Sequence, residues 1–256
     1  MPMNPELFDL HAEVELTHWW FVARRAILRR VLASVVPPGT DRVVIDVGCG
    51  TGANIAALAS DYEVIGIDTT ESAIDLARER FPAVPFVCGF APGDLGPDAA
   101  RADAFLLMDV LEHVPDDTAV LAPLVEQLSP GGVVLITVPA DMRLWSEHDE
   151  SFGHYRRYDA TRLRAAFDGL PVRERLLSPF NARLYPVVRS IRFLSQLRGR
   201  AWGRSGSDLD VPAAPINGML RRIFAGESGR LVDLVAGKGR PFRRGVSLMA
   251  VLERVG

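Results

Sequence analysis

One ten-residue segment constrains the fold of this chain more than any other part of it. It reads Val43-Val44-Ile45-Asp46-Val47-Gly48-Cys49-Gly50-Thr51-Gly52. The β-branched run favours a buried strand, and the three alternating glycines favour a tight turn in which backbone N–H groups can approach a ligand closely. The residues that follow, Ala53–Leu58, suit a helix whose N-terminus faces that ligand. The segment therefore predicts a strand, a nucleotide-binding loop and a helix in succession.

Two kinds of ligand suit this loop. Gly48 to Ala53 fits the dinucleotide pattern G-x-G-x-x-(G/A), and Asp68 is placed to hold a ribose in either case. Asp46 favours the second kind, because a carboxylate two residues before the first glycine would repel a pyrophosphate. The same carboxylate suits a ligand that carries an ammonium group and a sulfonium. S-adenosylmethionine is such a ligand.

Composition narrows the class of protein. With 256 residues, 48% of them hydrophobic, the chain can form one large domain with an insertion. A net charge of −3 gives no general attraction to DNA or RNA, so we expect no nucleic-acid partner. The only cysteines are Cys49 and Cys88, and residues 1–9 show no secretory leader. These features, with no apolar run of about 18 residues, predict a cytoplasmic protein.

The hydrophobic pattern predicts an α/β fold, a Rossmann-like doubly wound sheet of seven strands. The expected strands are Val43–Val47, Glu63–Ile67, Val84–Cys88, Ala104–Met108, Val133–Val138, Arg173–Leu177 and Ser247–Leu252. Thr69 or Thr70 is expected to cap a helix that runs to about Arg80. We divide the chain into an N-terminal helical cap (1–40), a core (41–180), a helical insertion or lid (181–244) and the last core strand (245–256).

Both regions outside the core are expected to cover the crevice at the carboxyl ends of the strands. The N-terminal helix carries an apolar face that also contains Arg24, which either forms an internal ion pair or meets a cofactor carboxylate. The insertion is basic and amphipathic, with Arg183, Arg189, Arg192, Arg198, Arg200 and Arg204. A solvated helix face, an anionic or lipid substrate, and peripheral membrane contact through 183–204 are the alternatives for it.

Several motifs in order resemble the class I S-adenosylmethionine-dependent methyltransferases. They are Asp46–Gly52, Gly66–Asp68 at the end of the second strand, Leu107–Val114 at the fourth, and Leu128–Val138 around a Pro-Gly-Gly turn. The resemblance implies the fold and the cofactor S-adenosyl-L-methionine, with S-adenosyl-L-homocysteine as product. The implied cofactor-binding residues are Trp20, Arg24, Asp46, Gly48, Cys49, Gly50, Asp68, Thr69, Phe90 and Asp109. The chain departs from the family after the third strand, where Cys88-Gly89-Phe90-Ala91 lacks the usual adenine-binding Asp; Phe90 either packs on the adenine or is an ordinary core residue.

The end of the fourth strand supplies catalytic candidates. His113 is a candidate general base with a pKa near neutrality, Glu112 is a second candidate, and a helix-capping role is the alternative for the histidine. The pattern Asp-x-x-Glu-His also resembles the ubiquinone-biosynthesis O-methyltransferases, whose divalent ion would correspond to Asp109, Glu112 and His113. Because metal-free relatives share this spacing, we expect no metal and keep these three residues as candidates only.

A segment after the fifth strand is rich in His, Arg and Tyr, which suits a polar or anionic acceptor. We expect Tyr155 to be catalytic and expect substrate contacts from His148, His154, Arg156 and Arg157. The alternative is a surface loop whose arginines pair with Glu147, Asp149 and Glu150.

The sequence thus predicts a methyltransferase whose partner is a small-molecule substrate, with a hydroxyl oxygen as the leading acceptor. The alternatives are C-methylation of an isoprenoid diphosphate or lipid-like acceptor, and a non-catalytic cofactor-binding or membrane-recruited protein. A dinucleotide-dependent oxidoreductase is a more distant alternative. The sequence gives no prediction of the oligomeric state.

Overall fold

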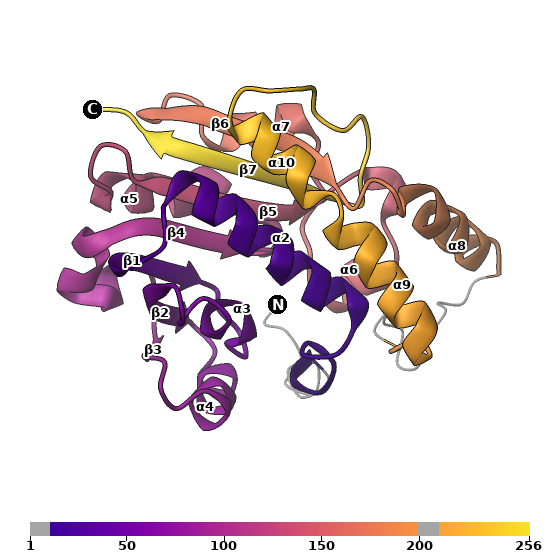
Figure 1. Ribbon diagram of the computed structural model, residues 1–256, viewed down its shortest axis with the longest axis horizontal. Coiled ribbons are helices and arrows are strands. Elements are labelled where there is room, and N and C mark those ends of the chain that lie inside the picture. Colours follow the sequence, from indigo (N-terminus) through magenta and orange to yellow (C-terminus); the bar gives the residue numbers. More distant parts are fainter. Residues whose placement is uncertain (1–10, 199–209) are drawn as a thin grey trace.

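The computed structural model describes residues 11–198 and 210–256, and its centre is one seven-stranded sheet (Figure 1). The strands lie in the order β3-β2-β1-β4-β5-β7-β6. Their bounds are β1 Gly39–Val47, β2 Tyr62–Asp68, β3 Phe86–Cys88, β4 Ala102–Met108, β5 Val133–Pro139, β6 Val172–Phe180 and β7 Ser247–Arg254. All pairs are parallel except those of β7, which runs antiparallel to both neighbours. The predicted α/β fold with seven strands is confirmed.

The central strands are apolar throughout because helices cover both faces of the sheet. Successive residues of β1 show the alternation: Val44 joins the core on one face, whereas Val43 and Ile45 join the core on the other. All three side chains are buried. The register carries β1 to its end at Val47, so the glycine loop emerges at the carboxyl edge of the sheet.

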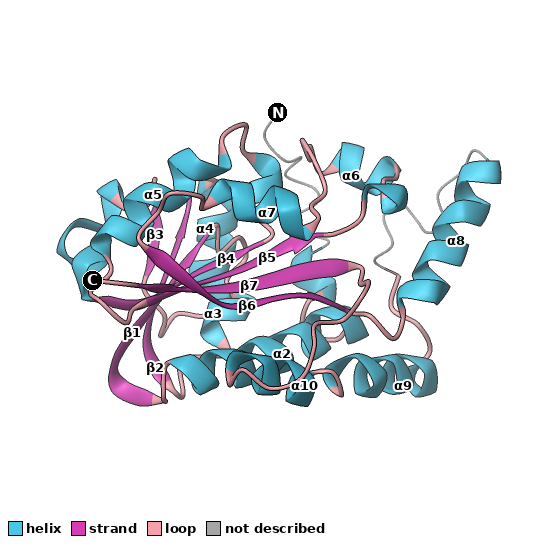
Figure 2. Ribbon diagram, turned by 90° about the horizontal axis from the view of Figure 1, so that it is seen from above, coloured by secondary structure: helices cyan, strands magenta, loops and turns pink. Residues whose placement is uncertain are grey.

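The helices form one layer on each face, with several short turns at the edges (Figure 2). Their bounds are α2 Trp19–Val35, α3 Ala53–Ala56, α4 Glu71–Arg80, α5 Asp117–Gln127, α6 Glu147–Ser151, α7 Ala160–Ala166, α8 Tyr185–Arg198, α9 Ala214–Ala225 and α10 Ser228–Val235, with 3-10 turns at Gly93–Arg101, Leu111–His113 and Met142–Leu144. Helices α2, α3, α4 and α10 supply the core of one face, and α5 and α7 supply the other.

The N-terminal helix differs from the expected cap. α2 packs across a face of the sheet, because its apolar side chains Ile27, Leu28, Val31 and Leu32 join the main core. α9 and α10 pack beside α2, so most of the described insertion also belongs to this layer (Figure 1). The first turns of α2 reach the carboxyl edge, where Arg24 pairs with Asp109 and lies over the ring of Trp20. The apolar face of α2 is long, so the helix buries more apolar surface by packing on the sheet than it would by covering the edge.

The cover over the carboxyl edge comes from two shorter segments. Val14, Phe21 and Phe152 form a small hydrophobic cluster that joins the N-terminal segment to the α6 region. The Thr51 hydroxyl donates to Glu15 Oε1 at 2.7 Å, and Arg80 also pairs with Glu15. These contacts hold residues 11–18 against the glycine loop. α8 instead extends away from the body at the same end (Figure 2).

Among the described residues, no helix has the length and apolar character needed to cross a membrane. Arg200 and Arg204 of the predicted basic insertion lie outside the described residues, as does the side chain of Arg198.

Candidate active site

The glycine loop forms an open cradle at the end of β1. Gly48 and Gly50 have φ of 72° and 52°, a region that side-chain-bearing residues rarely adopt. A Cβ on Gly48 would lie 2.6 Å from Val110 Cγ2, so this position has no space for a side chain. A Cβ on Gly50 would meet no atom within 4 Å, so the space beside it is open. The loop therefore offers its backbone to a ligand over Gly50.

Asp46 is a fully buried carboxylate for which the described residues supply no hydrogen-bond partner. Burial raises the pKa of Asp46 to about 7, although Arg24 opposes the rise. A buried carboxylate with no partner is costly, and a bound cation would remove that cost. The observation fits a ligand with an ammonium group.

Asp68, at the end of β2, holds the loop in place. Its Oδ2 accepts the N–H of Gly50 and its Oδ1 accepts the N–H of Thr70, both at 2.9 Å. Each oxygen retains a second lone pair, so the carboxylate can still accept two ribose hydroxyls. Thr69 is exposed beside it, and Thr70 is the residue before α4, without a side-chain cap bond. The buried Cys49 lies within the loop, where burial raises the pKa of its thiol.

Phe90 follows β3 and has 73% of its surface exposed, which excludes the interpretation as an ordinary core residue. Its N–H donates to Asp94 Oδ2 at 2.7 Å. An open aromatic ring at this edge of the sheet can stack on an adenine. The sequence pattern did not single out Asp94. Its carboxylate lies in the loop where the family's adenine-binding Asp is missing.

Arg24 forms the internal ion pair that was one of its two alternatives. Its Nη1 lies 2.7 Å from Asp109 Oδ2, and its Nη2 donates to Thr137 Oγ1 at 2.7 Å. The guanidinium also lies over the Trp20 ring, 4.8 Å from the centroid. Asp109 has a φ of 60°, and its N–H donates to the carbonyl of Thr137. These contacts fix the turn after β4, and a cofactor role for Trp20, Arg24 and Asp109 stays a prediction.

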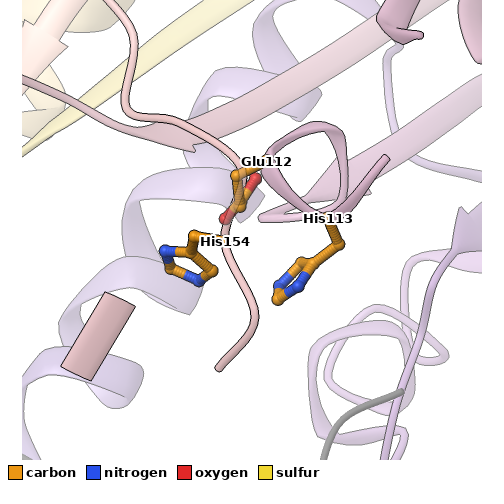
Figure 3. A group of neighbouring side chains, drawn as sticks. All are labelled: Glu112, His113 and His154. Atoms are coloured by element: carbon orange, nitrogen blue, oxygen red, sulfur yellow. The ribbon is translucent and has the colours of Figure 1, made fainter. Parts of the chain in front are cut away.

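Glu112, His113 and His154 come together at the end of β4 (Figure 3). One potential ligand atom from each lies within 4.8 Å of the others. The two imidazole rings meet edge to face with centroids 4.7 Å apart. A backbone bond, Tyr155 N–H to the Glu112 carbonyl at 2.7 Å, joins the segment that carries His154 to the turn that carries Glu112.

The electrostatics of this cluster change the expected roles. Burial and the neighbouring His154 lower the pKa of His113 to about 4, not near neutrality, so the ring is neutral at pH 7 and a weak base. Burial, reinforced by Asp109, raises the pKa of Glu112 well above its usual value. Both Glu112 oxygens are buried and have no hydrogen-bond partner among the described residues. Glu112 is therefore the stronger proton acceptor of the pair.

The same cluster defines which residues could hold a metal ion. The set differs from the one in the sequence pattern, because Asp109 is engaged by Arg24 and His154 takes its place. Two imidazoles and one carboxylate suit a transition metal better than Mg²⁺, and an unpartnered buried carboxylate fits such a ligand. A bound ion would lower the pKa of an acceptor hydroxyl.

Asp149 is a buried carboxylate surrounded by basic side chains. Its Oδ1 lies 3.0 Å from His154 Nδ1, its Oδ2 accepts from Arg157 Nη2 at 3.0 Å, and Arg192 Nη1 lies 3.7 Å away. These contacts and several further hydrogen-bond donors hold the pKa of Asp149 well below its usual range in spite of burial. Arg157 is buried and also donates to the carbonyl of Ala140, so it is a structural residue, which corrects its predicted substrate role.

The other residues predicted to contact the substrate differ in whether their side chains are already engaged within the protein. Arg156 pairs with Asp117 Oδ1 at 3.2 Å and donates to the carbonyl of Pro115, so its guanidinium is also engaged. Tyr155 has 55% of its surface exposed, with Arg156 beside its ring. The side chain of His148 lies outside the described residues. His154, in contrast, joins the cluster of Glu112 and His113.

Comparison with known proteins identifies the central part of the chain. Residues 44–132 match the methyltransferase domain family. This segment is similar to a methyltransferase domain. Trans-aconitate 2-methyltransferase of Methylobacterium radiotolerans is 35% identical over 117 residues, which are 43% of each chain. The matched segment thus spans less than half the length of that relative.

Solved structures show that the similarity in fold extends over most of the chain. A Haloferax volcanii putative methyltransferase, in complex with the Trm112 activator, superposes with a TM-score of 0.59, covering 97% of this chain and 98% of that chain at 20% identity. Geranyl diphosphate C-methyltransferase of Streptomyces coelicolor, which holds S-adenosyl-L-homocysteine, gives 0.53, covering 88% and 77% at 12% identity. The fold is thus the class I, Rossmann-like fold of S-adenosylmethionine-dependent methyltransferases, whose cofactor the glycine loop and Asp46 fit. The relatives named here are not ubiquinone-biosynthesis enzymes, so the more specific resemblance is not confirmed.

Sequence reasoning missed Glu15 and Thr137 as residues that shape the site, and it named Asp149 only as a partner for the arginines of a surface loop. Glu15 holds the N-terminal segment on the loop, Thr137 links Arg24 to β5, and Asp149 fixes His154. Only Asp149 had a local signal, since Ser146 and Asp149 have the spacing of a capping box, and Asp149 Oδ2 accepts the N–H of Ser146 at 2.9 Å.

Proposed function

We propose that this protein transfers a methyl group from S-adenosylmethionine to an oxygen of a small-molecule acceptor, with a hydroxyl as the leading acceptor. The observation that carries the proposal is the buried, unpartnered carboxylate of Glu112 beside His113 and His154. This cluster follows β4, on the same edge of the sheet as the glycine loop after β1. The donor and acceptor sites are therefore adjacent.

The reaction needs one proton acceptor. The acceptor oxygen attacks the methyl carbon, the carbon–sulfur bond breaks, and the hydroxyl proton passes to the Glu112 carboxylate. Burial raises the pKa of Glu112, which favours it as the proton acceptor, because a carboxylate of higher pKa is a stronger base. The sulfonium of the bound cofactor favours the ionised form of Glu112 before transfer. His113, neutral at pH 7, is suited to a hydrogen bond that orients the acceptor.

The rest of the site supplies alignment and the exclusion of water. Methyl transfer from a sulfonium is intrinsically favourable, so orientation accounts for most of what such a site must provide. The small cluster of Val14, Phe21 and Phe152 closes over the edge. Asp149 holds the His154 ring by Nδ1, which leaves Nε2 on the opposite side of the ring.

Glu112→Gln tests the proposal. The amide keeps the shape but cannot take the proton, so turnover with hydroxyl acceptors is expected to fall by about 10²–10⁴-fold. Label transfer from methyl-labelled S-adenosylmethionine to a panel of phenols, sugars and cell extract measures turnover, and calorimetry with S-adenosylhomocysteine measures cofactor affinity. The matched control is Glu126→Gln on the exposed side of α5, which should change neither quantity. Turnover of Glu112→Gln close to that of the control would contradict the base role.

A carboxylate acceptor is the second candidate. It is favoured by the similarity to trans-aconitate 2-methyltransferase, whose name gives an acidic substrate. An ionised carboxylate has no proton to lose, so its methylation needs no base. The same variant separates the two candidates: Glu112→Gln should lower methylation of hydroxyls by about 10²–10⁴-fold and leave methylation of carboxylates within about threefold of the unaltered protein.

A further inference from the structure

One cavity among the described residues lies outside the cluster of Glu112, His113 and His154. It is an open groove of about 910 Å³ between α8 and the segment that leads into β7. Its lining comprises Ala182, Tyr185, Pro186, Arg189, Ser190, Phe242, Arg243 and Arg244. Two segments more than fifty residues apart in sequence thus bring three guanidinium groups to one groove. We call this surface the arginine groove.

The three arginines differ from most others in the described structure. Arg157, Arg164 and Arg254, for example, each donate to a carboxylate or to backbone carbonyls. The guanidinium groups of Arg189, Arg243 and Arg244 form no hydrogen bond or ion pair with any residue in the described ranges, and all three residues are exposed. The nearby carboxylate of Asp141 is already engaged by Arg143 and by the Tyr185 hydroxyl. The groove therefore carries a local excess of positive charge.

Both walls of the arginine groove are held in place. On one side, Arg230 stacks over the Phe242 ring at 4.3 Å and donates to the carbonyl of Arg240. The N–H of Phe242 also donates to Ser178 Oγ on β6. On the other side, the Tyr185 hydroxyl donates to Asp141 and fixes the first turn of α8. Positions that are fixed in this way bind an anion with less loss of conformational entropy than free loops would.

The groove opens at the same edge of the sheet as the methyl-transfer site. β6 runs parallel to β5, because both pair antiparallel with β7. Their carboxyl ends, Phe180 and Pro139, therefore lie at the edge that carries the glycine loop and Glu112. A molecule bound in the groove would extend along this edge.

We propose that the arginine groove binds a phosphate or diphosphate group. Guanidinium groups match phosphate oxygens with paired hydrogen bonds, and three of them balance the charge of a diphosphate. This proposal rests on the proposed function, because it takes the molecule bound in the groove to be the methyl acceptor. Phosphate chemistry can come from a free metabolite or from a lipid headgroup, and the apolar side chains Val187, Phe193 and Leu194 on exposed parts of α8 are suited to the second.

The test compares two double variants with the same change in charge. Arg243→Gln with Arg244→Gln removes two groups from the groove, and the control, Arg221→Gln with Arg240→Gln, removes two exposed arginines outside its lining. Calorimetry with inorganic diphosphate, in the absence of S-adenosylmethionine, measures binding independently of methyl transfer. We expect the dissociation constant to rise at least about tenfold in the groove variant and less than about twofold in the control.

A second arm distinguishes the sources of phosphate. Sedimentation with phosphatidylcholine vesicles, with and without phosphatidic acid, measures attachment to a lipid headgroup. Loss of sedimentation only in the groove variant would support the proposal with a lipid source, and selective loss of diphosphate binding alone would support it with a free metabolite. Equal behaviour of the two double variants in both assays would overturn it. Because neither assay uses methyl transfer, such a result would leave the proposed methyltransferase activity untouched.

Discussion

The end of β1 and the α6 region each contain a buried carboxylate, and the two carboxylates lie in opposite environments. On the cofactor side, the buried carboxylate of Asp46 has no hydrogen-bond partner among the described residues. On the acceptor side, the buried carboxylate of Asp149 is surrounded by His154, Arg157 and Arg192. A buried charge can therefore indicate either of two kinds of site. An unpartnered buried charge indicates a ligand site, whereas a fully partnered one indicates a structural centre.

The largest expected effect comes from breaking the structural centre. Asp149→Asn removes the negative charge and leaves Arg157 buried without its counter-ion, so the free energy of unfolding should fall by about 3–5 kcal/mol. Urea denaturation at pH 7 measures the change. Since the pKa of Asp149 is lowered in the folded state, its stabilisation is fully present above the unfolded pKa and is lost only as pH falls below it toward the folded value.

Asp75→Asn is the matched control for that variant. Asp75 is exposed on α4 and pairs with Arg78 at 3.5 Å, so the same chemical change should have little effect there. A loss of stability in Asp149→Asn no larger than in this control would show that the buried network is not a structural centre.

The second prediction concerns the unpartnered charge. Asp46→Asn should weaken binding of S-adenosylmethionine by about 10–100-fold, because the ammonium loses its counter-charge. The apo protein should become more stable, since the amide removes a buried carboxylate that lacks a partner. Calorimetry and thermal unfolding measure the two opposite changes.

The pH dependence of the unaltered protein sharpens this prediction. The pKa of Asp46 is raised to about 7 in the folded state, so ionisation opposes folding, and apo stability should decrease as pH rises from about 4 through 7. Over the same range cofactor affinity should increase, by up to about tenfold per pH unit, because only the carboxylate attracts the ammonium. Retention of this pH dependence in Asp46→Asn would exclude Asp46 as its source.

Arg156 tests whether the acceptor-side arginines are structural. Its contacts with Asp117 and the Pro115 carbonyl predict that Arg156→Gln lowers the free energy of unfolding by about 1–2 kcal/mol. We expect kcat and KM to change less than about twofold. A large increase in KM with unchanged stability would instead assign Arg156 to the acceptor and weaken the contrast between the two sides.

The smallest effect is expected at the exposed pair of Arg164 and Glu174. Its geometry is bidentate at 2.8 Å, but 55% of the arginine side chain is exposed, so solvent screens the attraction. Arg164→Gln should lower the free energy of unfolding by less than about 1 kcal/mol, measured by urea denaturation. A loss comparable to that of Asp149→Asn would show that burial is not what separates these ion pairs.

Local patterns made the core of the fold predictable. All seven strands lie where the apolar runs indicated them, and Asp68 meets Gly50 because β1 and β2 pair in parallel and end at the same edge of the sheet. The antiparallel direction of β7 and the packing of α2 and α9 on a sheet face were not predictable in the same way. They depend on how distant apolar faces cover one another, which periodicity alone does not encode.

The site shows the same division at the level of single side chains. Local hydrophobic and glycine patterns place the strands and loops, so the groups at the carboxyl edge can be predicted from the sequence. Only the tertiary structure decided that Arg24 pairs with Asp109, that Arg157 pairs with Asp149, and that His154 joins Glu112 and His113. The physical reason is that the charge state and availability of a side chain depend on burial and on partners distant in sequence.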